Sequence, residues 1–311
     1  MRFNPKARLD RSRVRDAGRG SSRGGGTRSM SLPGGVAGGG GVVGLIVVIV
    51  FVAIQVFGGS DTGGGSTTSP ASSTYDSSRL ADSERYAGCE TGADANESSD
   101  CARVAVENSL YDFWSDTLGD EFEPEEAIVT FTGSVDTGCG GATSAVGPFY
   151  CPTDRTIYLD TGFFDEVLEK QLGGPDGGFV EPYVLAHEFG HHISNLQGNL
   201  GQVRGDTGPQ SSGVRLELQA DCYAGLWARG ATTTEDADGN VLIDELTDDD
   251  IRLALEAAAA VGDDRIQEQT GGQVTPETWT HGSAEQRQTW FRTGYEGGSV
   301  EDCDTFGADR V

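Results

Sequence analysis

The chain has 311 residues, only 36% of them hydrophobic, with 47 glycines and a net charge of −27 at pH 7. Such a length allows one or two domains, but the low apolar content and the many glycines exclude a chain that is globular throughout. The acidic excess also excludes a nucleic acid as a partner of the folded part, because the summed field would repel another polyanion.

The N-terminal region is basic and poor in residues that could form a core. Residues 1–41 hold nine of the 22 Arg and Lys residues, two acidic residues and a run of glycine and serine. Chains of this composition cannot bury enough apolar surface to offset the entropy that folding costs. We therefore predict a disordered basic arm over residues 1–35.

An apolar stretch follows this arm. Residues 42–57, "VVGLIVVIVFVAIQVF", carry no charge, and the glycines before them extend the uncharged run to the roughly 20 residues that a membrane-spanning helix needs. A cleaved signal peptide is the alternative, but its basic region would be unusually long and "QVFGGS" offers no small-x-small cleavage site. We predict an uncleaved single transmembrane helix over residues 36–57, which makes a lipid bilayer an expected partner.

The charges on either side of this segment predict its orientation. All nine early basic residues precede it, and none follows until Arg79. The positive-inside rule then places the N-terminus in the cytoplasm, with one pass through the cell membrane and the rest of the chain on the extracellular side. Residues 58–79 have the Gly/Ser/Thr composition of a flexible linker, and residues 80–311 are expected to form the folded domain.

Six cysteines all lie beyond the apolar segment. They are Cys89, Cys101, Cys139, Cys151, Cys222 and Cys303. An even number in an oxidising compartment predicts three disulfides, although six cysteines allow about 15 pairings. We predict that neighbours in the sequence pair, Cys89 with Cys101 and Cys139 with Cys151, which leaves Cys222 for Cys303. No Cys-x-x-Cys spacing indicates a thiolate zinc site.

Residue periodicity predicts an α+β domain that is mostly helical with a small sheet. The helical patterns cover residues 101–118, 182–196, 214–229, 248–261 and 283–293. Strand patterns occur at "EEAIVTFTG" and at Thr156–Leu159, where the second strand continues into a short helix. Strands that mostly precede helices favour the α+β class over alternating α/β units.

The stretch "HEFGHH" contains three of the four histidines and lies on the helix that Pro182 opens. His187 and His191 are four residues apart, so both imidazoles share one helical face, and Glu188 can approach the same ion through water. This HExxH arrangement predicts zinc, with Glu188 as the general base toward the zinc-activated water. His192 points away from the ion. The alternative is a surface helix rich in histidine, which would need no third ligand.

The third ligand is predicted on the next helix, "RLELQADCYAGLWARG". Glu217 and Asp221 lie four residues apart beside its apolar stripe, where acids are costly unless they are paired or bind a metal. Glu217 suits the third position around one zinc ion per chain. Asp221 suits the acceptor that fixes the tautomer of a ligating histidine. A solvated acidic face is the alternative for either residue.

His281 is the remaining histidine. Ser283 and Gln286 have the spacing of a capping box, which predicts a helix start there and leaves His281 on the preceding loop. A loop histidine that faces the zinc site could stabilise the oxyanion that develops on the scissile carbonyl. An ordinary surface position is the alternative. Arg287 is a lesser candidate for the same role, or for pairing with an acid.

These motifs resemble those of a known family. The HExxH sequence followed by the E-x-x-x-D pair Glu217 and Asp221 resembles the gluzincin metallopeptidases. More closely, five blocks resemble, in the same order, the putative neutral zinc metallopeptidase family of bacteria. They are "CGGATSAVGPFYCPTDRTIYLDTGFF", "LAHEFGHHISNLQG", "RLELQADCYAGLWA", "AVGDDRIQ" and "THGSAEQRQTWFRTGYEGG". The resemblance implies a zincin-like fold preceded by a basic arm and one membrane span, and zinc-dependent hydrolysis of a peptide or protein substrate.

An acidic stretch at residues 234–250, "TEDADGNVLIDELTDDD", departs from this pattern. Part of it has the spacing of a calcium-binding loop. The first ligand position would hold Thr234 instead of Asp, so the pattern is incomplete. A solvated acidic loop is the favoured interpretation.

The sequence therefore predicts a membrane-anchored zinc endopeptidase. An extended peptide is expected to pair along a strand edge near Thr156–Leu159, beside the helix that carries His187. Two alternatives are a catalytically inactive zinc-holding binding module and a scaffold of the cell envelope that contains a structural metal. Glu188 argues against both, because a structural site needs no carboxylate between its histidines.

Overall fold

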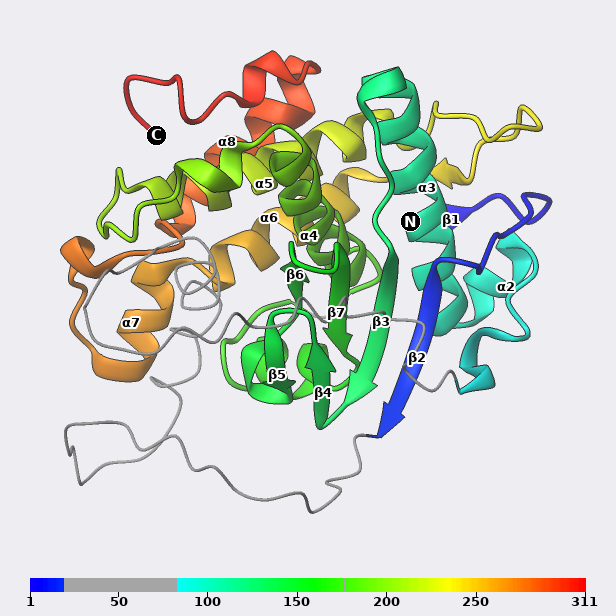
Figure 1. The fold of residues 1–311 in the computed structure, drawn as a ribbon, viewed down its shortest axis with the longest axis horizontal. Coiled ribbons are helices and arrows are strands. Elements are labelled where there is room, and N and C mark those ends of the chain that lie inside the picture. The colour runs from blue at the N-terminus through cyan, green and yellow to red at the C-terminus, as the bar shows by residue number, and fades with distance from the viewer. Residues whose placement is uncertain (20–82, 176) are drawn as a thin grey trace, which may run out of the picture.

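A four-stranded sheet and the helices packed against it form the frame of the protein in this computed structural model, which describes residues 1–19, 83–175 and 177–311 (Figure 1). The strand order is β2 (Val14–Arg19), β3 (Ala127–Thr132), β7 (Thr156–Asp160) and β6 (Phe149–Cys151). The first three strands run parallel to one another, and β6 is antiparallel to β7. The described part is thus α+β, as predicted.

Helices supply most of the remaining structure. They are α2 (Gly92–Glu97), α3 (Ser99–Leu118), α4 (Val180–Leu196), α5 (Ser212–Gly230), α6 (Asp248–Ala260), α7 (Asp263–Gly271) and α8 (Ala284–Gly297), with a π-helix, η5, at Phe164–Glu169. The five predicted helices and the two predicted strands are confirmed. The short α2, α7 and β6 were not predicted, because a few residues carry too little periodicity.

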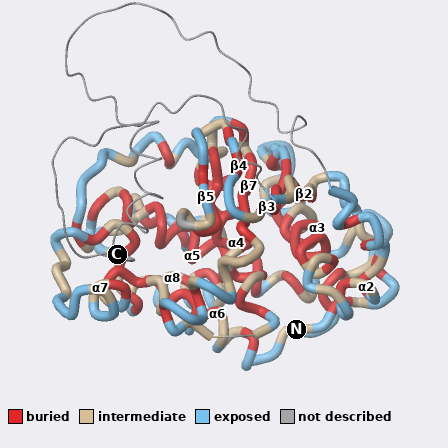
Figure 2. Tube along the Cα trace, turned by 90° about the horizontal axis from the view of Figure 1, so that it is seen from below, coloured by how far each residue is buried: buried red, intermediate tan, exposed pale blue. Residues whose placement is uncertain are grey.

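The two faces of the sheet bury different side chains, as the alternation along a strand requires. On β3, Ile128 joins the large core that includes α3, α4 and α5, whereas Val129 and Phe131 join a smaller core on the other face. That second face is covered by a hairpin of β4 (Ser134–Thr137) and β5 (Gly140–Thr143). Figure 2 shows that β3, β7 and the middle of α4 are mostly buried.

Glycines let three helices approach at backbone distance. A Cβ on Gly190 of α4 would lie 2.9 Å from the Cα of Ala220 on α5. A Cβ on Gly294 of α8 would lie 1.9 Å from the carbonyl oxygen of Cys222, also on α5. Only glycine permits such approaches without moving a helix. The close packing brings Glu217 and Asp221 of α5 against the histidines of α4, with Asp221 also contacting Arg287 of α8.

The first 19 residues are folded, so the prediction of a disordered arm over residues 1–35 is wrong for this part. Strand β2 pairs with β3, and β1 (Arg2–Phe3) pairs with β8 (Ile243–Glu245) of the acidic loop. Arg13 of this N-terminal segment contacts the buried carboxylate of Glu107 at 2.5 Å, a pairing that composition alone does not reveal. Figure 1 shows β2 in blue beside β3. Residues 20–35 lie outside the described residues.

This pairing does not fit the predicted membrane orientation. A single crossing by residues 36–57 would put residues 1–19 and 83–311 on opposite sides of a bilayer, yet they share one sheet. The predicted transmembrane helix and the linker at residues 58–79 lie outside the described residues. Within the described part, no helix has both the length and the apolar character needed for a membrane span.

The three disulfides are those predicted. They join Cys89 to Cys101, Cys139 to Cys151 and Cys222 to Cys303. The first two hold α3 and the edge strand β6 to neighbouring loops. The third ties α5 to the C-terminal segment, 81 residues further along the chain.

The acidic stretch at residues 234–250 serves as a partner for the N-terminal segment. Besides the pairing of β8 with β1, the backbone N–H of Asn4 donates to the carbonyl of Leu242. Asp236 accepts hydrogen bonds from the backbone N–H groups of Asp238 and Asn240, so its carboxylate closes the turn. The loop therefore has a structural role that its composition did not indicate.

Candidate metal centre

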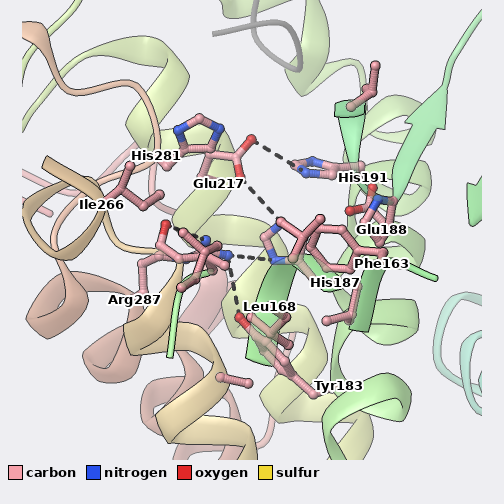
Figure 3. Close-up of a pocket in the computed structure, with 18 residues that line it drawn as sticks. Phe163, Leu168, Tyr183, His187, Glu188, His191, Glu217, Ile266, His281 and Arg287 are labelled. Carbon is pink, nitrogen blue, oxygen red and sulfur yellow. Dashed lines mark hydrogen bonds and ion pairs between the residues drawn. The ribbon is translucent and has the colours of Figure 1, made fainter. Parts of the chain in front are cut away.

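Helix α4 presents His187 and His191 on one face, where both are buried. Their ring centroids lie 4.8 Å apart, as expected for residues one helical turn apart. Helix α5 brings Glu217 against them. One of its carboxylate oxygens lies 3.3 Å from His187 Nε2 and the other lies 3.5 Å from His191 Nε2 (Figure 3). Among the described residues, these three form the group of donors that could hold a metal ion, with ligand atoms within 4.8 Å of one another.

Asp221 lies one turn further along α5 and orients His187. The Nδ1–H of His187 donates to Asp221 Oδ1 at 2.9 Å, which leaves Nε2 directed at Glu217. Arg287 of α8 contacts both oxygens of Asp221, at 2.7 and 2.9 Å, and the hydroxyl of Tyr183 donates to Oδ1 at 2.6 Å. The fully buried Asp221 is thus saturated with donors, and the salt bridges hold its pKa at about 2 despite burial.

The buried charges of this cluster favour a cation between the three donors. Glu217 and Asp221 bring two negative charges into the interior, and Arg287 brings one positive charge. In the protein alone, burial opposes a charged His187, but the nearby Asp221 carboxylate raises the pKa of His187 to about 9. A proton on His187 then supplies the positive charge that a metal ion would bring to the cluster. Two imidazoles and a carboxylate are a ligand set of catalytic zinc, which leaves a fourth position open, so these residues fit zinc.

Glu188 lies beside this cluster and does not belong to the donor group. Burial raises its pKa to about 7, although the positive charge of His187 and a hydrogen bond from the backbone N–H of Tyr150 act in the opposite direction. Tyr150 is on β6, at the edge of the sheet. A carboxyl group whose pKa is near neutrality, next to a metal site, can take up and release a proton during a reaction.

His281 is buried and lies near Glu217, so the surface alternative does not hold for it (Figure 3). Its Nδ1 lies 3.3 Å from Asp263 Oδ1, and Asp263 is itself held by the backbone N–H groups of Thr280, His281 and Gly282. Burial opposes a charged His281, yet the bond to Asp263 raises its pKa. Its Nε2 is buried with no hydrogen-bond partner among the described atoms, which leaves this nitrogen for a ligand.

His192 points away from the donors, as predicted, and is fully buried. The hydroxyl of Tyr150 lies 3.0 Å from its Nδ1, and its Nε2 lies 2.7 Å from the carbonyl oxygen of Glu123. Because a carbonyl only accepts, Nε2 carries the proton and Nδ1 accepts from Tyr150. His192 therefore joins α4 to the edge strand.

Two residues of the centre were missed from the sequence. Tyr183 precedes His187 by one helical turn, and this spacing could have indicated it. Asp263 lies in the family-like block "AVGDDRIQ", but no residue pattern in that block predicted its contact with His281. The role of Arg287, pairing with an acid, was one of the two considered, and the structure gives Asp221 as that acid.

The two histidines of the HExxH helix and a glutamate from a second helix thus form a candidate metal centre of the HExxH class. The sequence profile of the family described as "Putative neutral zinc metallopeptidase" matches residues 2–306, and the chain belongs to this family. The matched region includes the N-terminal strands, in agreement with their place in the fold.

Proteins from other bacteria are similar to a large part of this chain. The "Uncharacterized protein Rv2575" of Mycobacterium tuberculosis (strain ATCC 25618 / H37Rv) is 54% identical over 220 residues, which cover 70% of this chain and 74% of the relative. The "Uncharacterized protein YpfJ" of Escherichia coli (strain K12) is 40% identical over 204 residues, 62% of this chain and 67% of the relative. No solved structure matches the chain.

Proposed function

We propose that this protein is a zinc-dependent endopeptidase in which Glu188 acts as the general base. The observation that carries the proposal is the place of Glu188, a buried carboxyl group with a pKa of about 7 next to the His187, His191 and Glu217 donors. Zinc, when bound, supplies a Lewis acid that polarises the scissile carbonyl and acidifies water. The family description supports the same reaction class.

The residues around the metal donors take separate roles. Glu188 accepts a proton from the attacking water and passes it to the leaving nitrogen. The unpartnered Nε2 of His281 can donate to the oxygen of the scissile carbonyl as negative charge develops there, while Asp263 supports the charged imidazole. Asp221, held by Arg287, keeps the proton of His187 on Nδ1.

The substrate strand proposed from the sequence needs correction. Thr156–Asp160 forms β7, which has β3 on one side and β6 on the other, so it has no free edge for a peptide. Strand β6 is at the edge, and the N–H of its Tyr150 faces Glu188. We propose that an extended peptide binds along residues 146–148, which lead into β6 and line the cavity beside the metal donors.

The central experiment compares the wild-type protein with Glu188→Gln. The amide keeps the shape of the side chain but cannot accept the proton, so peptide hydrolysis should fall roughly 100- to 10,000-fold while bound zinc stays unchanged. Glu285→Gln, at an exposed position of α8, is the matched control. Unchanged hydrolysis in zinc-loaded Glu188→Gln would remove Glu188 from the mechanism.

The ligand set has its own test. Glu217→Ala should lose more zinc affinity than Asp221→Ala, because the first removes a ligand and the second removes only the partner of one. Equal retention of zinc in both variants would exclude Glu217 as a ligand. A catalytically inactive zinc-holding module is less well supported, because it gives no reason for a buried acid with a near-neutral pKa beside the donors.

We also propose that the folded domain works outside the cytoplasm. The three disulfides support this location, since disulfides persist in oxidising compartments. A membrane anchor over residues 36–57 remains a prediction from the sequence.

A further inference from the structure

A cavity with a volume of about 100 Å³ adjoins the metal donors. Its apolar walls come from five separate parts of the chain. They include Val146 before β6, Leu168 of η5, Val184 of α4, Ala257 of α6 and Ile266 of α7. Figure 3 shows Phe163 and Leu168 beside His187, with Ile266 toward His281. Residues from so many elements surround a space that none of them fills.

The polar groups that reach this cavity are already committed. Arg287 makes a two-point contact with Asp221, and Glu217 faces the two histidines. His281 and Glu188 belong to the chemistry proposed above. No lining residue therefore remains to pair with a charged side chain, and burial of an unpaired charge is strongly unfavourable.

An unfilled apolar space in a core destabilises a protein, so it is rarely kept without a use. Ligand sites combine such a space with a few converging polar groups, and this cavity has the metal donors and Glu188 at one side. Its size suits one side chain and not a folded segment. Ala257 has the shortest side chain among the apolar wall residues and sets how deep a substrate side chain can enter.

We propose that this cavity selects substrates with a large apolar side chain, such as leucine or phenylalanine, next to the scissile bond. The proposal rests on the peptidase function and names its substrate class. Ala257 is then a specificity-determining residue, and it lies outside the groups that perform the reaction. Substrates with glycine, aspartate or lysine at that position gain nothing from the apolar walls.

The first test compares peptides that differ only in the residue next to the cleaved bond. Ala257→Leu fills the cavity, so kcat/KM for leucine and phenylalanine peptides should fall roughly 10- to 100-fold, with glycine peptides changed by less than about threefold. Ala259→Leu is the control, because Ala259 is on the same helix but lines a separate outer hollow with Glu256. Equal losses for all peptides in folded, zinc-loaded Ala257→Leu would overturn the proposal.

The second test does not need turnover. Leucine hydroxamate and glycine hydroxamate carry the same metal-binding group, so calorimetry on the zinc-loaded protein measures the contribution of the side chain. The leucine compound should bind at least about tenfold more tightly, and Ala257→Leu should remove that difference. Equal affinities would refute the cavity proposal even in an active peptidase. A clear difference without cleavage of any peptide would keep the cavity and reject the peptidase function.

Should Ala257→Leu fail to fold, Leu168→Ala tests the same wall in the opposite direction. Leu168 is 1% exposed, and its truncation widens the cavity. Peptides with tryptophan next to the cleaved bond should then gain roughly tenfold over leucine peptides. An unchanged order of preference would count against the proposal.

Discussion

Asp221 is the residue on which the geometry of the centre depends most. It is fully buried and accepts hydrogen bonds from Tyr183, His187 and Arg287. Its charge therefore both compensates a buried guanidinium and fixes an imidazole. Removal of one partner from a buried ion pair lowers folding stability far more than loss of a surface pair does, because the other charge is left unpaired in the interior.

Asp221→Asn should accordingly lower stability by about 3–5 kcal/mol and zinc affinity by roughly 10- to 100-fold. Urea unfolding and competition with a chelator measure the two effects. Asp249→Asn provides the control, because the pair of Asp249 with Arg252 is exposed to solvent and its loss should leave stability nearly unchanged. Wild-type zinc affinity in Asp221→Asn would show that His187 needs no acceptor.

A second buried acid, Glu125, contributes to the dependence of stability on pH. Glu125 is 2% exposed, and its carboxyl oxygens have no hydrogen-bond partner among the described atoms. Burial, and then the neighbouring charge of Glu107, raise its pKa well above 4.5. Above pH 4.5 the unfolded chain loses this proton while the folded chain keeps it. The contribution of Glu125 to stability is therefore present at low pH and is lost as pH rises toward its folded-state pKa.

Glu125→Gln should remove that loss, because an amide stays neutral. Above pH 4.5, the stability of the wild type should fall relative to the variant as pH rises, by at most about 1.4 kcal/mol for each pH unit. Urea unfolding at several pH values gives the comparison. Glu126→Gln, at an exposed position next in sequence, should follow the wild type. Parallel curves for wild type and Glu125→Gln would contradict the raised pKa.

At the scale of elements, the contact of α4 with α5 sets the distance between the metal donors. Gly190 lies between His187 and His191 in the sequence, and it packs against Ala220, three residues after Glu217. A methyl group there meets the α5 backbone at 2.9 Å, closer than real Cβ atoms approach, so a helix must move. Gly190 thus permits the helix contact that brings Glu217 against the two histidines.

Gly190→Ala should therefore separate α4 from α5 and lower zinc affinity at least tenfold. Helix propensity alone would instead predict that alanine stabilises the folded protein by about 0.5–1 kcal/mol and leaves the zinc site intact. Gly271→Ala at the end of α7, where a Cβ meets nothing within 4 Å, is the control. Zinc titration decides the matter: full affinity in Gly190→Ala would mean that the helices adjust without moving Glu217.

The elements that were predictable from the sequence are those with local signals. The HExxH helix, the E-x-x-x-D helix and the capping box at Ser283 each follow from residues within one or two turns. Strand β2 reads "VRDAGR" and has no apolar run. It forms by pairing with β3, and this partner lies more than 100 residues further along the chain, so no local pattern predicts the strand. Likewise, the pairing of Arg287 with Asp221 depends on helix contacts that a linear pattern does not encode.

At the scale of the whole molecule, residues 1–19 and 83–311 should be on the same side of any membrane. Lys6→Cys and Asp309→Cys place single thiols at exposed positions of the two parts. A membrane-impermeant maleimide should label both variants alike, either in intact cells or only after permeabilisation. Labelling of Asp309→Cys alone in intact cells would instead support the single-pass orientation predicted from charge.

The chain leaves the sheet after Arg19 and has returned by Ser83, whose N–H donates to the carbonyl of Asp16 at 2.9 Å. Exit and entry are thus adjacent, and residues 20–82 amount to an insertion between two neighbouring points of one fold. Substitutions, insertions or deletions within residues 20–82 need not displace these two ends, because the pairing of β2 with β3 and the hydrogen bond from Ser83 to Asp16 hold them in place.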